Sequence, residues 1–315
     1  MKTICRIFVI AAVMLSHPAL YAQASIDLDV FTRVEYQVAG EIKARNLYVQ
    51  AVGDIGHGFS YGLNQRFDKF PKADGLLDAT DWVYIRYTTP NGKWMFSGGK
   101  DVIAVGGMEY KENPIDVHFY SGFCNNIVGC FQLAASASYM PNPNDIFICQ
   151  VSHTPFHVAG DKLYAYNFRW RGTHGIWSTS YSVNLVQDPE FSYVAYAAIG
   201  NRFSFLGFDL DIDYTLRALP SNFSLIKDFT AGCKLAWSYG KSLVLFAKAY
   251  YDRNMGDLAY DHLFELDTAY ATLGGGVEYY PLKKDNIRIY SYYCNIAGAN
   301  TVALGVKWRI DVLTL

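Results

Sequence analysis

One tight cluster in the sequence has the residue types that hydrolases use: Ser152 and His153, followed by His157. A serine beside an imidazole base is the arrangement of nucleophilic catalysis, and histidines are common zinc ligands. Ser152 and His153 are neighbours on a predicted strand, so their side chains point to opposite faces and cannot share a proton there. Two imidazoles without a third ligand make no metal site. We therefore expect no catalytic residue, no metal site, no cofactor and no enzyme activity.

A second pattern is the row of carboxylates at Asp209, Asp211 and Asp213. Residues at steps of two share one face of a strand, so these side chains gather together. They can attract cations, but calcium takes six or more oxygen ligands and no turn here supplies the rest. We interpret the row as solvated acids on one strand face.

The third pattern lies in residues 104–128, which show no strand alternation. Gly106-Gly107 and Asn113-Pro114 turn the chain, and the aromatic residues around them can pack, so we expect an ordered loop. Charges of both signs lie in or next to it, and they are the candidate constriction residues of an aqueous path: Lys100, Glu109, Lys111, Glu112 and Asp116.

The rest of the chain explains what positions these residues. Between Thr301 and Ile310, apolar residues alternate with small or basic ones, which gives a strand one apolar and one polar face. The pattern recurs about sixteen times in segments of roughly ten residues, as in transmembrane barrels. The predicted strands are 26–36, 43–54, 57–68, 79–89, 92–103, 129–139, 144–154, 160–171, 174–186, 190–200, 203–217, 228–238, 241–252, 269–281, 285–296 and 300–311.

The connections between these strands alternate in length. Short turns, Asn201-Arg202 among them, lie at one end, and every longer connection lies at the other: 69–78, 104–128, 218–227 and 253–268. Barrels of the outer membrane have short periplasmic turns and longer outer loops. The sequence therefore predicts an all-β protein: a closed antiparallel transmembrane β-barrel of about 16 strands, with its long third outer loop folded into the lumen.

Composition agrees with this class. The chain has 25 Tyr, 20 Phe and 6 Trp but no amphipathic helix to cover them, so lipid is the apolar medium that they need. A formal net charge of −2 disfavours nucleic-acid partners. We expect interfacial aromatic girdles, where rings meet both headgroups and hydrocarbon, to contain Trp82, Trp94, Trp170, Trp177, Trp237 and Trp308.

The first residues have the form of a secretory signal. A charged start is followed by an apolar run from Ile7 to Leu15 and by small residues near Ala24, so residues 1–24 form the predicted signal peptide and residues 25–315 the barrel. Cys124 and Cys130 lie in one loop of an exported protein, and the sequence leaves open whether they form a disulfide.

If the apolar parity faces lipid, the other parity faces water inside. That places five arginines on the pore wall, Arg33, Arg66, Arg86, Arg169 and Arg171, with Lys234, Lys248, Lys307 and Arg309 and a set of acids that includes Glu35, Asp213, Asp252 and Glu278. Loop acids opposite wall arginines predict a transverse field that orders water and favours polar solutes. The alternative is that these charges only hydrate the interior.

The loop also carries a family resemblance. Gly98-Gly99-Lys100, Gly106-Gly107-Met108-Glu109-Tyr110, Asn113-Pro114-Ile115-Asp116-Val117 and Tyr120-Ser121 resemble a Bacteroidota porin family related to the phosphate-selective porin O and P group. The resemblance implies a 16-stranded outer-membrane barrel, often a homotrimer, whose third outer loop constricts the pore. Phosphate-binding members have basic residues in the constriction, whereas this loop has three acids, so phosphate selectivity does not carry over.

These patterns predict a porin in the bacterial outer membrane that lets small hydrophilic solutes or ions diffuse passively, constricted by the loop 104–128. Its expected partners are outer-membrane lipid, lipopolysaccharide, small hydrophilic solutes and copies of itself. The alternative is a barrel that acts as receptor, adhesin or structural anchor. Such a role favours long outer loops or a plug domain, and most predicted outer loops here are short.

Overall fold

The computed structural model describes residues 25–38, 40–69, 75, 77–127, 130–156, 162–188, 192–220, 224–255, 267–282 and 286–314. The predicted signal peptide, His157 and much of two predicted outer loops lie outside the described residues. No helix of the described residues is long and apolar enough to cross a membrane.

The described chain is built almost entirely of strands. They are β1 Asp27–Gln37, β2 Glu41–Gly56, β3 Phe59–Arg66, β4 Thr80–Thr88, β5 Trp94–Val102, β6 Phe131–Asn142, β7 Asp145–His153, β8 Tyr164–His174, β9 Trp177–Asp188, β10 Ser192–Phe205, β11 Phe208–Ala218, β12 Asp228–Tyr239, β13 Leu243–Asn254, β14 Thr268–Tyr279, β15 Ile287–Ile296 and β16 Ala299–Thr314. Two short helices, α2 Met108–Lys111 and α3 Gly122–Asn126, lie between β5 and β6.

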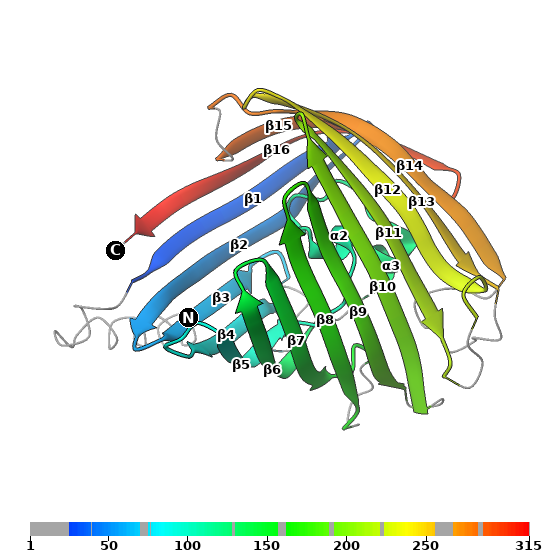
Figure 1. Cartoon of the computed structure of the whole chain (residues 1–315). Coiled ribbons are helices and arrows are strands. Elements are labelled where there is room, and N and C mark those ends of the chain that lie inside the picture. Colours follow the sequence, from blue (N-terminus) through cyan, green and yellow to red (C-terminus); the bar gives the residue numbers. More distant parts are fainter. Residues whose placement is uncertain are drawn as a thin grey trace.

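The sixteen strands pair antiparallel in chain order, and β1 pairs with β16, so the sheet closes into a ring (Figure 1). This confirms the predicted closed 16-stranded antiparallel barrel. Closure leaves no strand edge unpaired, which a membrane requires because hydrocarbon offers no hydrogen bonds.

Some predicted turns were misplaced, such as the one between the predicted strands 160–171 and 174–186, where β8 continues to His174. Asn201 and Arg202 lie within β10, and the chain reverses at Leu206 and Gly207 instead. Both turn residues have positive φ, 50° and 82°, as two-residue hairpin turns require. The shift matters because Arg202 becomes a strand residue that pairs with Asp211.

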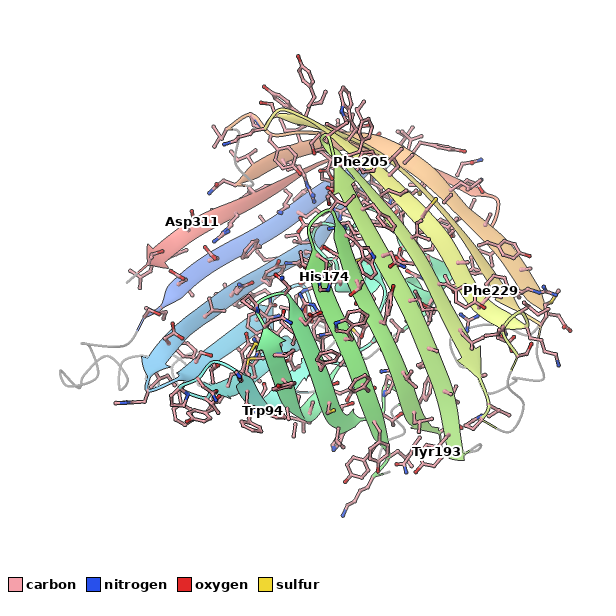
Figure 2. The ribbon with its side chains drawn as sticks, viewed as in Figure 1. Trp94, His174, Tyr193, Phe205, Phe229 and Asp311 are labelled. Carbon is pink, nitrogen blue, oxygen red and sulfur yellow. The ribbon has the colours of Figure 1, made fainter. Side chains whose placement is uncertain are left out.

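The two faces of the ring differ in polarity. On β16, the side chains of Val302, Leu304 and Ile310 are exposed, whereas Ala303 and Lys307 are buried. Figure 2 shows side chains projecting outward from the ribbon, with Trp94, Phe205 and Phe229 among those labelled. An apolar, exposed outer face and a polar inner face are what a lipid-embedded barrel needs.

Trp82 corrects the predicted set of girdle residues. It pairs with Asn64, whose side chain is buried, and its ring stacks on Tyr84 with centroids 5.4 Å apart. Trp82 therefore belongs to the inner face. The other five tryptophans have the outer parity, and Trp94 is the first residue of β5.

Residues 103–127, between β5 and β6, form what we call the connecting segment. It corresponds to the predicted loop 104–128 and is ordered over the described residues, with buried apolar side chains that include Ile103, Met108, Ile115 and Phe123. The Ser121 side chain caps α3 by accepting a hydrogen bond from the Cys124 amide at 3.3 Å. The thiols of Cys124 and Cys130 are both free.

Candidate pore site

The connecting segment begins with two glycines that let its backbone approach the inner face of β9 and β10. The Gly106 amide donates to Ser182 Oγ at 2.7 Å, and the Gly107 amide donates to the Ser180 carbonyl at 2.9 Å. A Cβ on Gly106 would lie 2.8 Å from that same carbonyl, so the position requires glycine. Gly107 has a φ of 96°, which also favours glycine.

Asp213 on β11 holds the start of α2. Its carboxylate accepts hydrogen bonds from the Met108 amide at 2.6 Å and the Glu109 amide at 2.9 Å, and from the Tyr250 hydroxyl at 2.8 Å. The three acids of this row thus have different partners: Asp213 binds the segment, Asp211 binds Arg202 and Asp209 binds Ser204. Among the described residues, no group of three or more His, Cys, Asp or Glu is placed to hold a metal ion.

Glu109 is a buried anchor of the segment. Its carboxylate forms an ion pair with Lys248 on β13 and accepts hydrogen bonds from the Ser121 amide and hydroxyl. Burial alone raises the pKa of a carboxyl, but Lys248 and Ser121 outweigh it and hold the pKa of Glu109 below its ordinary value. Lys248 also donates to the Phe119 carbonyl at 2.7 Å.

The other two predicted acids are also paired with cations of the C-terminal strands. Glu112 binds Lys234 on β12 and lies 3.7 Å from Arg202 on β10. Asp116 lies 2.6 Å from Lys307 on β16 and 3.3 Å from Arg288 on β15. The segment acids therefore bind the wall itself.

Near the seam of the ring, where β1 pairs with β16, Arg33 on β1 binds the segment backbone. Its Nη1 donates to the Val117 carbonyl at 2.5 Å, its Nη2 to Glu35 at 2.8 Å and its Nε to the Tyr290 hydroxyl at 2.6 Å. Arg288 donates to the Ile115 carbonyl at 3.0 Å. The carbonyls of Ile115 and Val117 are thus bound from both sides of the seam.

His118 lies in an aromatic setting beside the seam. Its Nε2 is 2.6 Å from Glu278 Oε1, and its ring stacks on that of Phe246 and lies tilted against that of Tyr290. Burial, opposed by the Glu278 bond and assisted by the nearby Arg288 and Arg33, lowers the pKa of His118 to about 4. At neutral pH the imidazole is uncharged and donates to the carboxylate.

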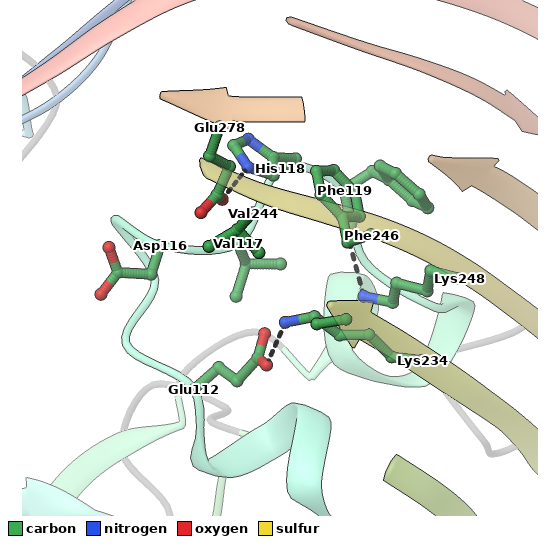
Figure 3. A pocket seen from close by; sticks show the side chains of 11 residues that line it. Glu112, Asp116, Val117, His118, Phe119, Lys234, Val244, Phe246, Lys248 and Glu278 are labelled. Atoms are coloured by element: carbon green, nitrogen blue, oxygen red, sulfur yellow. Dashed lines mark hydrogen bonds and ion pairs between the residues drawn. The ribbon is translucent and has the colours of Figure 1, made fainter. Parts of the chain in front are cut away.

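Two hollows border the segment. The smaller, about 400 Å³, lies toward β12 to β14 and is lined by charged and aromatic side chains that include Lys234, Phe246 and Glu278 (Figure 3). The larger, about 1230 Å³ including its opening to solvent, lies between the segment and strands β2 to β5 and β8. We call it the main hollow. Its charged lining residues are Arg66, Asp81, Arg86, Asp101, Glu109, Lys111, Glu112, Arg169 and Arg171.

The structure brings most predicted site residues to this main hollow. Arg66, Arg86, Arg169, Arg171, Glu109, Lys111 and Glu112 line it, whereas Asp116 lines the smaller hollow and Arg33 is buried at the seam. Lys100 is not among them: it shares the parity of the exposed Phe96 and donates to the Leu77 carbonyl at 2.6 Å. It lies on the outer face.

Three residues that contact the connecting segment or lie within it escaped the sequence reasoning. Arg202 was assigned to a turn, Arg288 lay in a strand with mixed faces, and His118 stood alone in the loop. A signal existed for Arg288, because it shares its parity with Tyr290 and Tyr292, whose rings are buried. No local pattern marks His118.

Comparison with known proteins agrees with this geometry. Residues 19–175 match the family described as phosphate-selective porin O and P. The chain forms a porin-type barrel of the bacterial outer membrane. No curated protein matches the chain. The match supports a porin channel in general terms, while the Bacteroidota branch stays a prediction.

Solved structures share the porin-type fold at low identity. The outer membrane channel DcaP of Acinetobacter baumannii is 13% identical, with a TM-score of 0.64 over 92% of this chain and 98% of that one. An anion-selective porin from Comamonas acidovorans is 11% identical, with a TM-score of 0.62 over 91% and 100%. OmpT of Vibrio cholerae in a trimer form is 9% identical, with a TM-score of 0.60 over 91% and 100%. At these identities the likeness shows the fold.

Proposed function

We propose that the barrel is a passive diffusion channel whose lumen is narrowed by the connecting segment. The observation that carries this is the spread of the segment's partners: side chains of β1 and of β7 to β16 bind it, among them Arg33, Asp213 and Lys307. A segment that bonds to so much of a closed ring fits inside the ring, and a 16-stranded barrel has room for it.

The main hollow is the path that we assign to solutes. It is lined by guanidinium, carboxylate and phenol groups, which suit small hydrophilic solutes and ions. The transverse field takes a different form from the predicted one, because the segment acids are neutralised by lysines of the C-terminal strands. On the wall, Arg66 of β3 pairs with Asp81 and Arg86 of β4 pairs with Asp101, so the positive side of the path lies at β8, with Arg169 and Arg171.

Planar-bilayer recording tests the proposal. Purified protein should give steps of ohmic current, and liposomes that contain it should swell in small sugars. A variant with residues 110–120 replaced by a short glycine-serine linker should give larger steps, because the narrowing is gone. Absence of current and of swelling in the unmodified protein would reject the channel and favour a receptor or anchor. Equal conductance in the two proteins would reject constriction by the segment.

Three further parts of the proposal concern assembly. We propose that residues 1–24 are removed as a signal peptide, that the mature barrel contacts outer-membrane lipid and lipopolysaccharide, and that it forms a homotrimer. Mass spectrometry of protein from outer membranes should find Ser25 as the first residue, and native mass spectrometry in detergent should find three chains. A start upstream of Ser25 contradicts the first, and a monomer contradicts the last.

A further inference from the structure

Among the described residues, the main hollow has more positive than negative side chains that lack an oppositely charged partner, because all of its acids are paired. Asp81 binds Arg66 at 3.3 Å, and Asp101 binds Arg86 at 3.0 Å. Glu109 and Glu112, which border the hollow from the segment side, bind lysines of β13 and β12 that do not line it. Each of the four acids is thus neutralised by a cation.

Three cations of the same hollow have no such partner. In the part of the chain that the structure describes, no carboxylate lies within ion-pair distance of Lys111, Arg169 or Arg171. Arg169 donates only to the Val105 carbonyl at 3.3 Å, and the Nε groups of both arginines are buried without any hydrogen-bond partner. Buried donors that lack a partner cost free energy, and no carboxylate compensates the positive charges of these two guanidinium groups among the described residues.

The three cations also repel one another. Burial, together with the charges of Arg171, Arg202 and Arg169, lowers the pKa of Lys111 below its ordinary value. Like charges held together in a partly dry site create a positive potential that attracts an anion. Lys111 comes from α2 and the two arginines from β8, so the anion would be held between the segment and the wall.

Apart from the amides of Gln50, Asn64 and Asn113, much of the remaining lining of the hollow is apolar or aromatic. The rings of Trp82 and Tyr84 stack against each other, and the guanidinium of Arg86 lies 3.6 Å over the Tyr84 ring. Tyr110, Pro114, Ile127 and Phe131 also line the space. Such a wall binds an apolar body by dispersion and by removing it from water.

We propose that Lys111, Arg169 and Arg171 form a binding site for small organic monocarboxylates with an apolar or aromatic body. The carboxylate sits against the three cations and the body against the aromatic wall. Inorganic phosphate fits less well, because it has no apolar part to place against the aromatic wall. This inference rests on the proposed channel and names the solute class of its path.

Single-channel recording in chloride tests the site with four probes. Benzoate carries both features, acetate only the charge, benzyl alcohol only the body, and phosphate the charge without the body. We expect benzoate to block the chloride current at a concentration at least about tenfold lower than acetate, phosphate or benzyl alcohol, as loss of one charged hydrogen bond or of an apolar ring predicts.

Substitutions separate the site from general electrostatics. In the Arg169→Gln, Arg171→Gln double variant, the benzoate concentration for half block should rise about tenfold or more, since the charged hydrogen bonds are lost. Arg309→Gln is the matched control: this arginine pairs with Asp29 on β1 and does not line the hollow, so block should stay as in the unmodified protein. Circular dichroism of each variant checks that the barrel is intact.

The outcomes are distinct. Normal current without benzoate block, block equal to that by acetate or phosphate, or equal loss of block in Arg309→Gln would each overturn the site and leave the channel in place. If Arg169→Gln, Arg171→Gln fails to fold, Lys111→Gln must still weaken block, and unchanged block there overturns the site. Absence of current in the unmodified protein would overturn the channel and the site together.

Discussion

The buried pair between Glu109 and Lys248 is the strongest test of how the connecting segment is held. Both side chains are 4% exposed, and Lys248 also binds the Phe119 carbonyl. In Lys248→Met the apolar part of the side chain is kept, but Glu109 becomes a buried charge without its cation. Breaking a buried pair in this way costs about 3–5 kcal/mol.

That cost falls on the docked state of the segment. At 1.4 kcal/mol for each factor of ten, the population with an undocked segment should rise by about a hundredfold to a few thousandfold. In single-channel recordings, brief excursions to a higher conductance should become more frequent than in the unmodified protein, by the same factor as the undocked population. In urea unfolding from lipid vesicles, the midpoint should fall.

Lys43→Met is the matched control. Lys43 pairs with Glu41 in a contact whose side chains are 43% and 61% exposed, and exposed pairs contribute about 0–1 kcal/mol. Its traces and midpoint should match the unmodified protein. The double variant Glu109→Gln, Lys248→Met removes the orphaned charge and should recover part of the loss. If Lys248→Met and Lys43→Met behave alike in both assays, the reasoning is refuted.

Three further predictions concern the same segment. Gly200→Val should raise the single-channel conductance, because a Cβ there would lie 2.6 Å from the Met108 amide and push α2 away; Gly98→Ala, with no atom within 4 Å of its Cβ, should not. Lowering the pH from about 6.5 to 4 should reduce the free energy of unfolding, because His118 takes up a proton at a higher pH in the unfolded state than in the folded state. In His118→Asn the free energy of unfolding should depend less on pH over this range. An unchanged pH dependence in that variant contradicts the assignment. Glu112→Gln should shift the reversal potential in a salt gradient toward anion preference, because it leaves Lys234 uncompensated, and an unchanged potential would show that this pair does not influence the path.

Much of the fold could be predicted because the alternation of residues within each strand distinguishes its apolar face from its polar face. Alternation along residues such as Val302 to Ile310 is local, and sixteen repetitions of it specify a ring. The error at Asn201-Arg202 arose because alternation continues past those residues, through Phe203 and Phe205, and the turn depends on Leu206 tolerating a positive φ. Turn position in a hairpin is a property of backbone geometry that residue type specifies only weakly.

The candidate site was only partly predictable. The sequence indicated which charges belong to the segment, because strand alternation is absent there, and which arginines belong to the inner face, because of their parity along the strands. It did not indicate that Glu109, Glu112 and Asp116 bind Lys248, Lys234 and Lys307, because those pairings depend on which distant strands a long segment contacts. Trp82 shows the same limit: its type suggested an interface, but its register placed it beside Asn64.

The bonds at the seam have a consequence for assembly. Residues 115 to 117 accept hydrogen bonds from both ends of the chain: from Arg33 near its start, and from Arg288 and Lys307 near its end. The strands at the two ends of the chain thus bind the same three residues of the connecting segment. The pairing of β1 with β16 therefore brings cations from both ends of the barrel onto three successive residues of the segment, so closure of the ring completes this set of contacts.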